Sequence, residues 1–196
     1  MANLFDKILA DGVRAGQIPA RTQQARDWFR DTASGKKVNE EQLKRLNADR
    51  ARGSFQPGSM FLFRYDAKHK DTLPYWDAMP LVFPLKAAEG GFYGLNLHYL
   101  QPQMRAKLMD GLYDTTNNTR YDESTKVNVS AAFLDAASRV DYIKPCLKRY
   151  LTSHVYGGFT YIHPSEWDIA LFLPLADWQN ASWHTVYKHS RRMVRG

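Results

Sequence analysis

The sequence has a single cysteine, Cys146, among its 196 residues. This excludes an intramolecular disulfide framework and a paired-cysteine zinc site. The chain also lacks an apolar run long enough to cross a membrane, because its longest apolar stretch, IALFLPLA, is interrupted by Pro174. The N-terminal residues MANLFDKILADGV lack the continuous apolar segment of a secretory signal. We therefore expect a protein made in the cytoplasm, without a membrane partner, in which Cys146 packs as a small buried side chain.

Recognisable catalytic motifs are absent as well. There is no P-loop, dinucleotide-binding fingerprint or nucleophile elbow. The histidines include no HExxH pair, and His184 and His189 are five residues apart, outside the four-residue spacing that brings two ligands together on a helix. Two aspartates flank Lys68 and Lys70, as in a metal-dependent nuclease, but alternating charges within one loop are typical of a solvated surface. We expect no enzyme activity, no metal and no cofactor, and keep a nuclease as an alternative.

What the chain has in excess is positive charge. Lysine and arginine total 27 against 20 acidic residues, which gives a formal net charge of +7. This balance favours an acidic partner: a nucleic acid, an anionic membrane or an acidic protein surface. A soluble protein whose surface is basic without a dedicated partner fits the same numbers.

Residues 1–54 differ in composition from the rest of the chain. They hold eleven lysines and arginines against seven acidic residues, and few β-branched residues. The pattern predicts helices at 3–13, 22–31 and 39–53, the last opened by a capping box between Asn39 and Gln42. Because Leu43 and Leu46 are the only strong apolar positions of this third helix, we expect it to lie on the surface or on a partner. We interpret residues 1–54 as a helical N-terminal arm that is ordered mainly by its neighbours.

Residues 55–196 form the predicted body. The pattern predicts strands at 60–65, 80–85, 92–100, 159–163 and 166–173, with a tight turn at 89–91. It predicts helices from 102 onward and at 130–140, 145–152 and 182–195, and a polar surface loop at 114–128. The fold class is therefore α+β: a small antiparallel SH3-like β-barrel or curled sheet decorated by helices.

The C-terminal helix carries the first candidate for binding an acidic partner. Lys188, Arg191, Arg192 and Arg195 are spaced by three, four and seven residues, so they form one stripe opposite an apolar side of the helix. No acidic residue follows Asp177. Such a stripe is suited to tracking phosphates, although it is also typical of an ordinary solvated helix face.

The loop after the first predicted strand carries the second candidate. Lys68 and Lys70 lie in this loop, with Arg64 nearby, and loops at the mouth of a barrel commonly bind ligands. Tyr75 and Trp76 of the same loop are suited either to stacking on bases or to closing the end of the barrel. The third candidate is the basic pair Lys148 and Arg149.

Two blocks of the sequence resemble a known family. The segments GSMFLFRYDAKHKDTLPYWDAMPLVFPL and GGFYGLNLHYLQPQMRAKLMDGLY are similar to those of tailed-phage virion proteins of the T-even type and of marine myophages, the DNA end-protector family. The segment EWDIALFLPLADWQNAS, followed by a basic helix, resembles the C-terminal end of the same proteins. The following residues fill the pattern YDxKxKxxLPYxDxxPLV: Tyr65, Asp66, Lys68, Lys70, Leu73, Pro74, Tyr75, Asp77, Pro80, Leu81 and Val82.

The resemblance implies a non-enzymatic virion protein that joins late in assembly and contacts DNA ends or the DNA passage. We expect it to cap DNA ends at the neck of the particle, where a basic surface occludes the duplex end from exonucleases. The alternative is a tail or baseplate protein that binds only other virion proteins. In either case we expect virion proteins as partners and several copies in a symmetric assembly.

Overall fold

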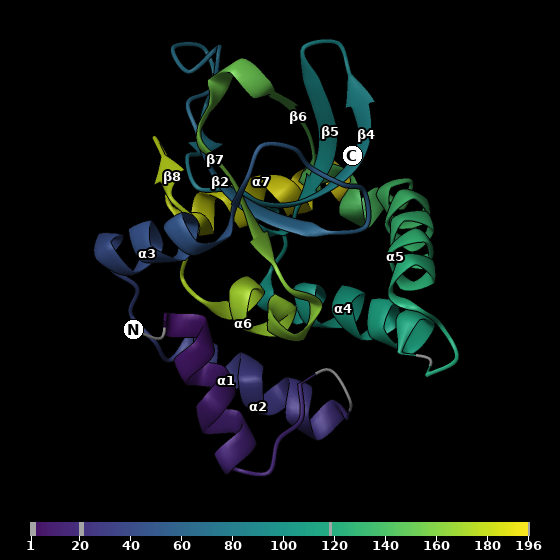
Figure 1. The fold of residues 1–196 in the computed structure, drawn as a ribbon. Coiled ribbons are helices and arrows are strands. Elements are labelled where there is room, and N and C mark those ends of the chain that lie inside the picture. The colour runs from purple at the N-terminus through teal and green to yellow at the C-terminus, as the bar shows by residue number, and fades with distance from the viewer. Residues whose placement is uncertain (1–2, 20–21, 118, 196) are drawn as a thin grey trace.

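The computed structural model describes residues 3–19, 22–117 and 119–195. Its helices are α1 (Leu4–Arg14), α2 (Gln23–Ser34), α3 (Glu40–Arg50), α4 (Pro102–Thr116), α5 (Glu123–Ser138), α6 (Trp167–Phe172) and α7 (Trp183–Arg195). Short 3₁₀ segments are η1 (Leu97–Tyr99), η2 (Asp141–Cys146), η3 (Thr152–His154) and η4 (Pro164–Glu166). The strands are β1 (Ala51–Arg52), β2 (Met60–Tyr65), β3 (Trp76–Asp77), β4 (Leu81–Ala88), β5 (Gly91–Asn96), β6 (Leu147–Leu151), β7 (Val155–Ile162) and β8 (Trp178–Gln179). Helices and antiparallel strands together confirm the predicted α+β class (Figure 1).

The main sheet is antiparallel and runs in the order β1-β7-β2-β4-β5-β6, while β3 and β8 form a separate pair. Side chains along β2 alternate between the two faces of this sheet. Met60 and Leu62 enter the main core, whereas Phe61 and Phe63 enter a second apolar cluster. Both faces are therefore buried at β2, which is why its sequence is continuously apolar from Met60 to Phe63.

The second cluster shows that the sheet is curled. Phe92 on β5 contacts Phe159 on β7, with ring centroids 5.8 Å apart, although β2 and β4 lie between these two strands in the sheet. Phe63 contacts Phe159 at 5.3 Å and Tyr150, on the edge strand β6, at 5.2 Å. Aromatic rings thus fill the inside of the curl. Of the two predicted forms, the structure has the curled sheet, with β1 and β6 as its edges in the described part of the chain.

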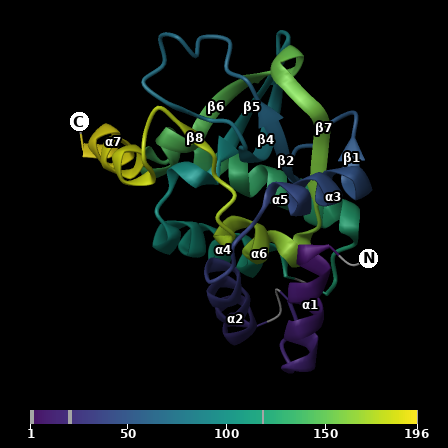
Figure 2. The same ribbon diagram turned by 90° about the vertical axis from the view of Figure 1, so that its left-hand side faces the viewer.

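Helices cover one side of this sheet in two layers. In Figure 1 α4 and α6 lie below the sheet, and α1 and α2 lie below α4 and α6. Trp167 of α6 packs edge to face on Phe83 of β4, with ring centroids 4.9 Å apart. Phe5 of α1 and Phe29 of α2 belong to the same core cluster as Phe83. The helix α7 lies on another side of the molecule, away from α1 and α2 (Figure 2).

The N-terminal helices begin where the sequence predicts, because side chains cap their first turns. Thr22 accepts a hydrogen bond from the N–H of Ala25, and Asn39 and Gln42 form the predicted capping box of α3. The polar α3 lies against β7 and buries Leu46. The division at residue 54 into an arm and a body stays a prediction.

Buried ion pairs fasten these N-terminal helices to the body. The Arg30 guanidinium of α2 donates to Asp168 of α6 at 2.7 Å and to Asp110 of α4 at 2.8 Å. The Arg50 guanidinium, at the end of α3, donates hydrogen bonds to both carboxylate oxygens of Glu166. Because Arg30, Asp168 and Glu166 are all buried, these pairs are largely removed from water.

Two predicted elements are wrong. Residues 147–151 form the strand β6, not a helix, because they pair with β5 in a ladder in which Lys148 faces Gly94. Residues 166–173 are not a strand, since Trp167–Phe172 form the buried helix α6. In both segments the apolar run is too short for its period to separate helix from strand. The predicted polar loop is also shorter than expected, because α4 continues to Thr116 and Asp122 caps α5 by accepting from the N–H of Thr125.

Candidate nucleic-acid interface

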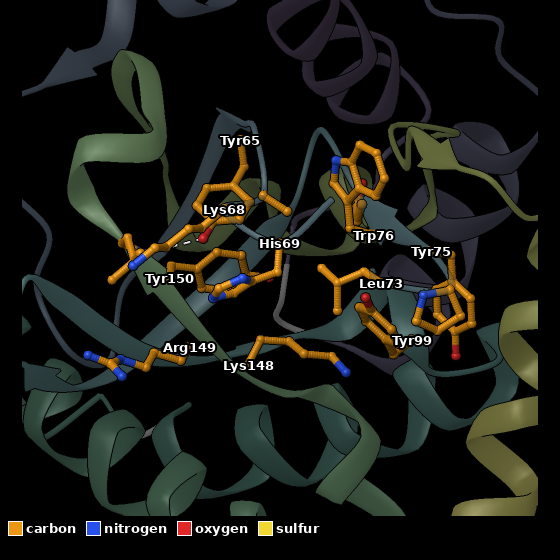
Figure 3. A pocket seen from close by; sticks show the side chains of 14 residues that line it. Tyr65, Lys68, His69, Leu73, Tyr75, Trp76, Tyr99, Lys148, Arg149 and Tyr150 are labelled. Carbon is orange, nitrogen blue, oxygen red and sulfur yellow. Dashed lines mark hydrogen bonds between the residues drawn. The ribbon is translucent and has the colours of Figure 1, made fainter. Parts of the chain in front are cut away.

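A pocket of about 470 Å³ opens beside the edge strand β6, where the loop after β2 folds back over the sheet (Figure 3). Aromatic side chains make up much of its wall: Tyr65, Tyr75, Trp76, Tyr99 and Tyr150. Basic side chains make up another part: Lys68, His69, Lys148 and Arg149. A cavity of this size falls within the range of roughly 300–1,000 Å³ that is usual for small-molecule sites.

Ring contacts hold the aromatic wall in place. Tyr99 meets Trp178 edge to face with centroids 4.8 Å apart, and Tyr75 meets the same Trp178 at 6.2 Å. On the other side of the pocket, Tyr65 meets Tyr150 at 5.0 Å, which ties the end of β2 to β6. Edge-to-face geometry is the favoured arrangement of aromatic pairs. The wall is therefore continuous with the packed interior rather than carried by a free loop.

Asp77 fixes the end of the loop that follows β2 through hydrogen bonds. Its carboxylate accepts hydrogen bonds from the backbone N–H groups of Met79 and Asp177 and from the side chains of Asn96 and His98. Burial disfavours the charged form of Asp77 and by itself would raise the pKa of its carboxyl. The interaction with His98 and the hydrogen bonds from the other donors outweigh burial and hold this pKa below its ordinary value. Burial lowers the pKa of His98, and the neighbouring Asp77 carboxylate opposes this shift. Asp77 therefore has a structural role, joining the loop, β5 and the entry to β8.

Lys148 is the unusual cation of the pocket. Its ammonium lies 3.9 Å from the centroid of the Tyr99 ring, a cation–π contact. Figure 3 shows its side chain extending toward Tyr99, while Arg149 extends in the opposite direction. Burial lowers the pKa of Lys148. Among the residues that the structure describes, no carboxylate lies within 4 Å of this ammonium, so its loss of hydration is not offset by an ion pair.

The other predicted basic residues of this region divide into two groups. Lys68 and Arg149 are exposed at the rim of the pocket, and Arg149 donates to the backbone oxygen of Glu89 at 2.9 Å. Lys70 instead forms an ion pair with Asp66 at 2.9 Å. Arg64 lies outside this pocket and contacts Glu40 of α3 at 3.4 Å.

The helix α7 presents its predicted basic stripe to solvent. Lys188, Arg191 and Arg192 are exposed, whereas Val186 and Tyr187 are buried. Two residues predicted on the apolar side differ from this pattern, because Trp183 is 52% exposed and Met193 is 64% exposed. The side chain of Arg195 lies outside the described residues.

The helix α7 is attached next to the pocket. The ring of His189 on α7 lies 5.6 Å from the ring of Tyr75, which lines the pocket. The Tyr187 hydroxyl accepts a hydrogen bond of 2.6 Å from the buried Arg105. Arg191 lines a separate small depression that also includes Tyr99. The helix α7 therefore adjoins residues that line the pocket, Tyr75 and Tyr99.

The structure thus brings Lys68 close to Lys148 and Arg149, which lie far from it in the sequence, and places α7 beside them. Tyr150 lies beside the basic pair Lys148 and Arg149 in the sequence, but the helix predicted at 145–152 gives no indication that Tyr150 lines a pocket. The contribution of Tyr99 is not predicted, and the alternation within FYGLNLHYL is the signal that could have indicated it.

Two features are absent from the described ranges, 3–19, 22–117 and 119–195. No group of three or more His, Cys, Asp or Glu side chains there is placed to hold a metal ion. No helix in the same ranges combines the length and the apolar character needed to cross a membrane. Cys146 is buried, as the sequence predicts, and burial raises the pKa of its thiol to about 12.

The structure is that of a basic α+β protein with an aromatic-lined pocket at the edge of its sheet. The chain matches the family described as the phage T4 terminal DNA protecting protein over residues 1–191, and it belongs to this family. The resemblance found in the sequence is thereby confirmed and extends along the whole matched length. Neither the curated proteins nor the solved structures include a match to this chain.

Proposed function

We propose that the protein binds the ends of double-stranded phage DNA and protects them by occlusion, without catalysis. Membership of a family named for protecting terminal DNA supports this proposal. The observation that carries it in the structure is the group of cations beside the pocket. Within the described part of the chain, Lys68, Lys148, Arg149, Lys188, Arg191 and Arg192 form no ion pair with a carboxylate.

Free cations on one wall are suited to phosphates. Each phosphate that they neutralise releases condensed counterions, which lowers log K by about 0.9 for each tenfold rise in salt. The exposed Lys188, Arg191 and Arg192 would contact the duplex backbone, and the pocket beside them would face its end. A protein docked in this way blocks the position at which an exonuclease loads.

Exonuclease protection tests the proposal directly. Linear duplex DNA with free ends is incubated with the protein and then with a double-strand exonuclease, and a nicked circle of the same sequence serves in parallel binding assays. We expect the half-life of the linear DNA to increase with protein concentration, and binding to linear DNA to exceed binding to the circle. Equal binding to both forms, or digestion at the unprotected rate, would contradict the proposal.

The place of the protein in the particle forms a second part of the proposal. We place it in the virion, at the neck, in several copies and in contact with other virion proteins. The tail or baseplate alternative has one observation in its favour, because the exposed Trp183 and Met193 of α7 are suited to a protein contact. Labelling the protein in intact particles distinguishes the two. Label at the tail tip, with no DNA affinity in the isolated protein, would support the alternative.

A further inference from the structure

The pocket beside β6 combines three properties that point to one ligand. It has a cavity of about 470 Å³, which is within the usual size range for one small molecule. Its wall includes the half-buried rings of Tyr75 and Trp76 and the buried ring of Tyr99. A poorly hydrated cation, Lys148, lies at the wall without a carboxylate partner among the described residues. We infer that this pocket holds a single unpaired nucleotide at the end of a DNA strand.

The aromatic rings account for the base. Every nucleobase has a flat π-face, so stacking on aromatic side chains is strong and tolerates any sequence. Tyr75 and Trp76 are each half-buried, so part of each ring stays open to the pocket. Because their positions are fixed by Trp178 and by the β3–β8 pair, the rings need little ordering when a base enters.

Lys148 accounts for the phosphate. A partly desolvated ammonium with no carboxylate partner gains more from an anion than an exposed lysine does, because part of its hydration is already lost. Lys68 stands at the rim of the same pocket and adds a second, exposed cation. Asp77 also lines the pocket, but its carboxylate already accepts four hydrogen bonds from the protein, so its charge is held by the fold.

The inference rests on the proposed function and explains how an end would be distinguished from internal duplex. Removing a base from the interior of a duplex costs a few kcal/mol of stacking and pairing, and the cost is least where the base is already single-stranded. Strand ends therefore supply an unpaired nucleotide far more readily than internal positions. A pocket for one nucleotide, beside a basic helix that contacts the backbone, selects ends without reading sequence.

The test measures binding of the full-length protein to hairpin duplexes that have one open end. The probes have a blunt end, a one-nucleotide 5′ or 3′ overhang, or an abasic overhang with the same phosphate. We expect one of the overhangs to bind about tenfold more tightly than the blunt end, and the abasic overhang to lose most of that gain. The Lys148→Met variant should bind overhang and blunt ends equally. The matched control is Lys86→Met, which removes another lysine lying over a tyrosine ring, 5.4 Å from Tyr93, outside the pocket.

A second measurement keeps the test valid if Lys148→Met does not fold. A terminal 5-iodo-deoxyuridine in the overhang is photo-crosslinked to the wild-type protein, and the linked peptide is identified by mass spectrometry. Links to Tyr75, Trp76 or Tyr99 support the inference, and links confined to α7 overturn it. The outcomes of the binding assay separate the two proposals. Protected ends together with equal affinity for blunt and overhang probes would overturn only the inference about the pocket. If the protein bound none of the probes, the proposed function would be contradicted as well. A Lys148→Met variant that loses binding to a virion protein, but not to DNA, would assign the pocket to a protein side chain instead.

Discussion

Two groups of cations in this molecule have opposite surroundings. On the side of the N-terminal helices, the buried Arg30 and the partly buried Arg50 are paired with the buried carboxylates of Asp168 and Glu166. On the side of the pocket and α7, cations such as Lys148 and Arg191 form no ion pair among the described residues. The first group holds helices onto the body, and the second group is available to a partner.

This contrast shows that net charge alone does not locate a binding surface. Arginines that are already paired with carboxylates contribute little to the attraction of DNA, although they are counted among the 27 lysines and arginines of the chain. The informative quantity is the set of cations that the fold leaves unpaired on one wall. Each of the following predictions tests whether the two groups have separate roles.

The largest expected effect is on stability, from the paired group. Replacing Arg30 by Met leaves the buried Asp168 without its cation and removes a partner of Asp110. We expect the free energy of unfolding to fall by about 3–5 kcal/mol, because a buried charge is left uncompensated. Chemical denaturation measures this loss. The exposed pair Lys44–Glu40 offers the control, since Lys44→Met should change stability by less than about 0.5 kcal/mol. A loss of similar size in both variants would contradict the expectation that the buried ion pairs of Arg30 stabilise the fold more than the exposed pair Lys44–Glu40.

The next effect concerns the turn that positions β6 and Lys148. A Cβ atom at Gly91 would lie 1.8 Å from the backbone oxygen of Tyr150 on β6, so Gly91→Ala must push the edge strand away. At Gly90 the backbone has a φ of +66°, but a Cβ atom would meet only a side-chain atom of Leu151 at 3.9 Å. We expect Gly91→Ala to cost about 3 kcal/mol and Gly90→Ala about 1 kcal/mol. Thermal unfolding of the two variants gives the comparison. Equal losses would mean that β6 does not depend on this close approach.

The unpaired group is tested by reversing the charge of α7. Changing Lys188, Arg191, Arg192 and Arg195 together to Glu should lower DNA affinity by about a hundredfold and reduce the salt dependence, while the body still folds. The matched control, Lys44→Glu with Arg45→Glu, reverses two cations on the exposed face of α3. It should leave affinity within about threefold, apart from the general effect of net charge. Unchanged affinity in the quadruple variant would exclude α7 as a DNA contact.

The smallest expected effect is a dependence of stability on pH. Burial lowers the pKa of His98 below its ordinary 6.5, so the unfolded chain takes up this proton first and stability falls as the pH drops below about 6.5. Burial raises the pKa of Asp168 from 3.8 to about 6, so the folded chain takes up this proton first and stability rises as the pH drops through 6. The two contributions oppose each other in wild type. In Asp168→Asn only the His98 contribution remains in this pH range. Between pH 6.5 and 5 the free energy of unfolding of this variant should therefore fall by about 1 kcal/mol more than that of the wild type. A variant with the wild-type pH profile would show that Asp168 does not titrate in this range.

The sequence predicts the local features of the fold better than the site. The capping box of Asn39 and Gln42, the turn at Gly90 and the extent of α7 depend on short-range chemistry, and all are found. The assignment of β6 failed because pairing with β5, more than fifty residues earlier, decides its structure. Without that strand, Lys148 could not be placed opposite Lys68. The pocket forms only when β6 pairs with β5, and the five residues of β6 do not specify this pairing by themselves.

The hydrogen bonds of Asp77 have a consequence for the kinetics of binding. Because four hydrogen-bond donors fix this carboxylate, we expect the wall of the pocket to have its final shape before a ligand arrives. Association then involves no slow closing step, and its rate is set by diffusion and by electrostatic attraction, which weakens with salt. The lifetime of the complex depends instead on the dissociation rate, which the contacts inside the pocket determine. Salt should therefore change how fast an end is captured, whereas substitutions inside the pocket should change how soon it is released.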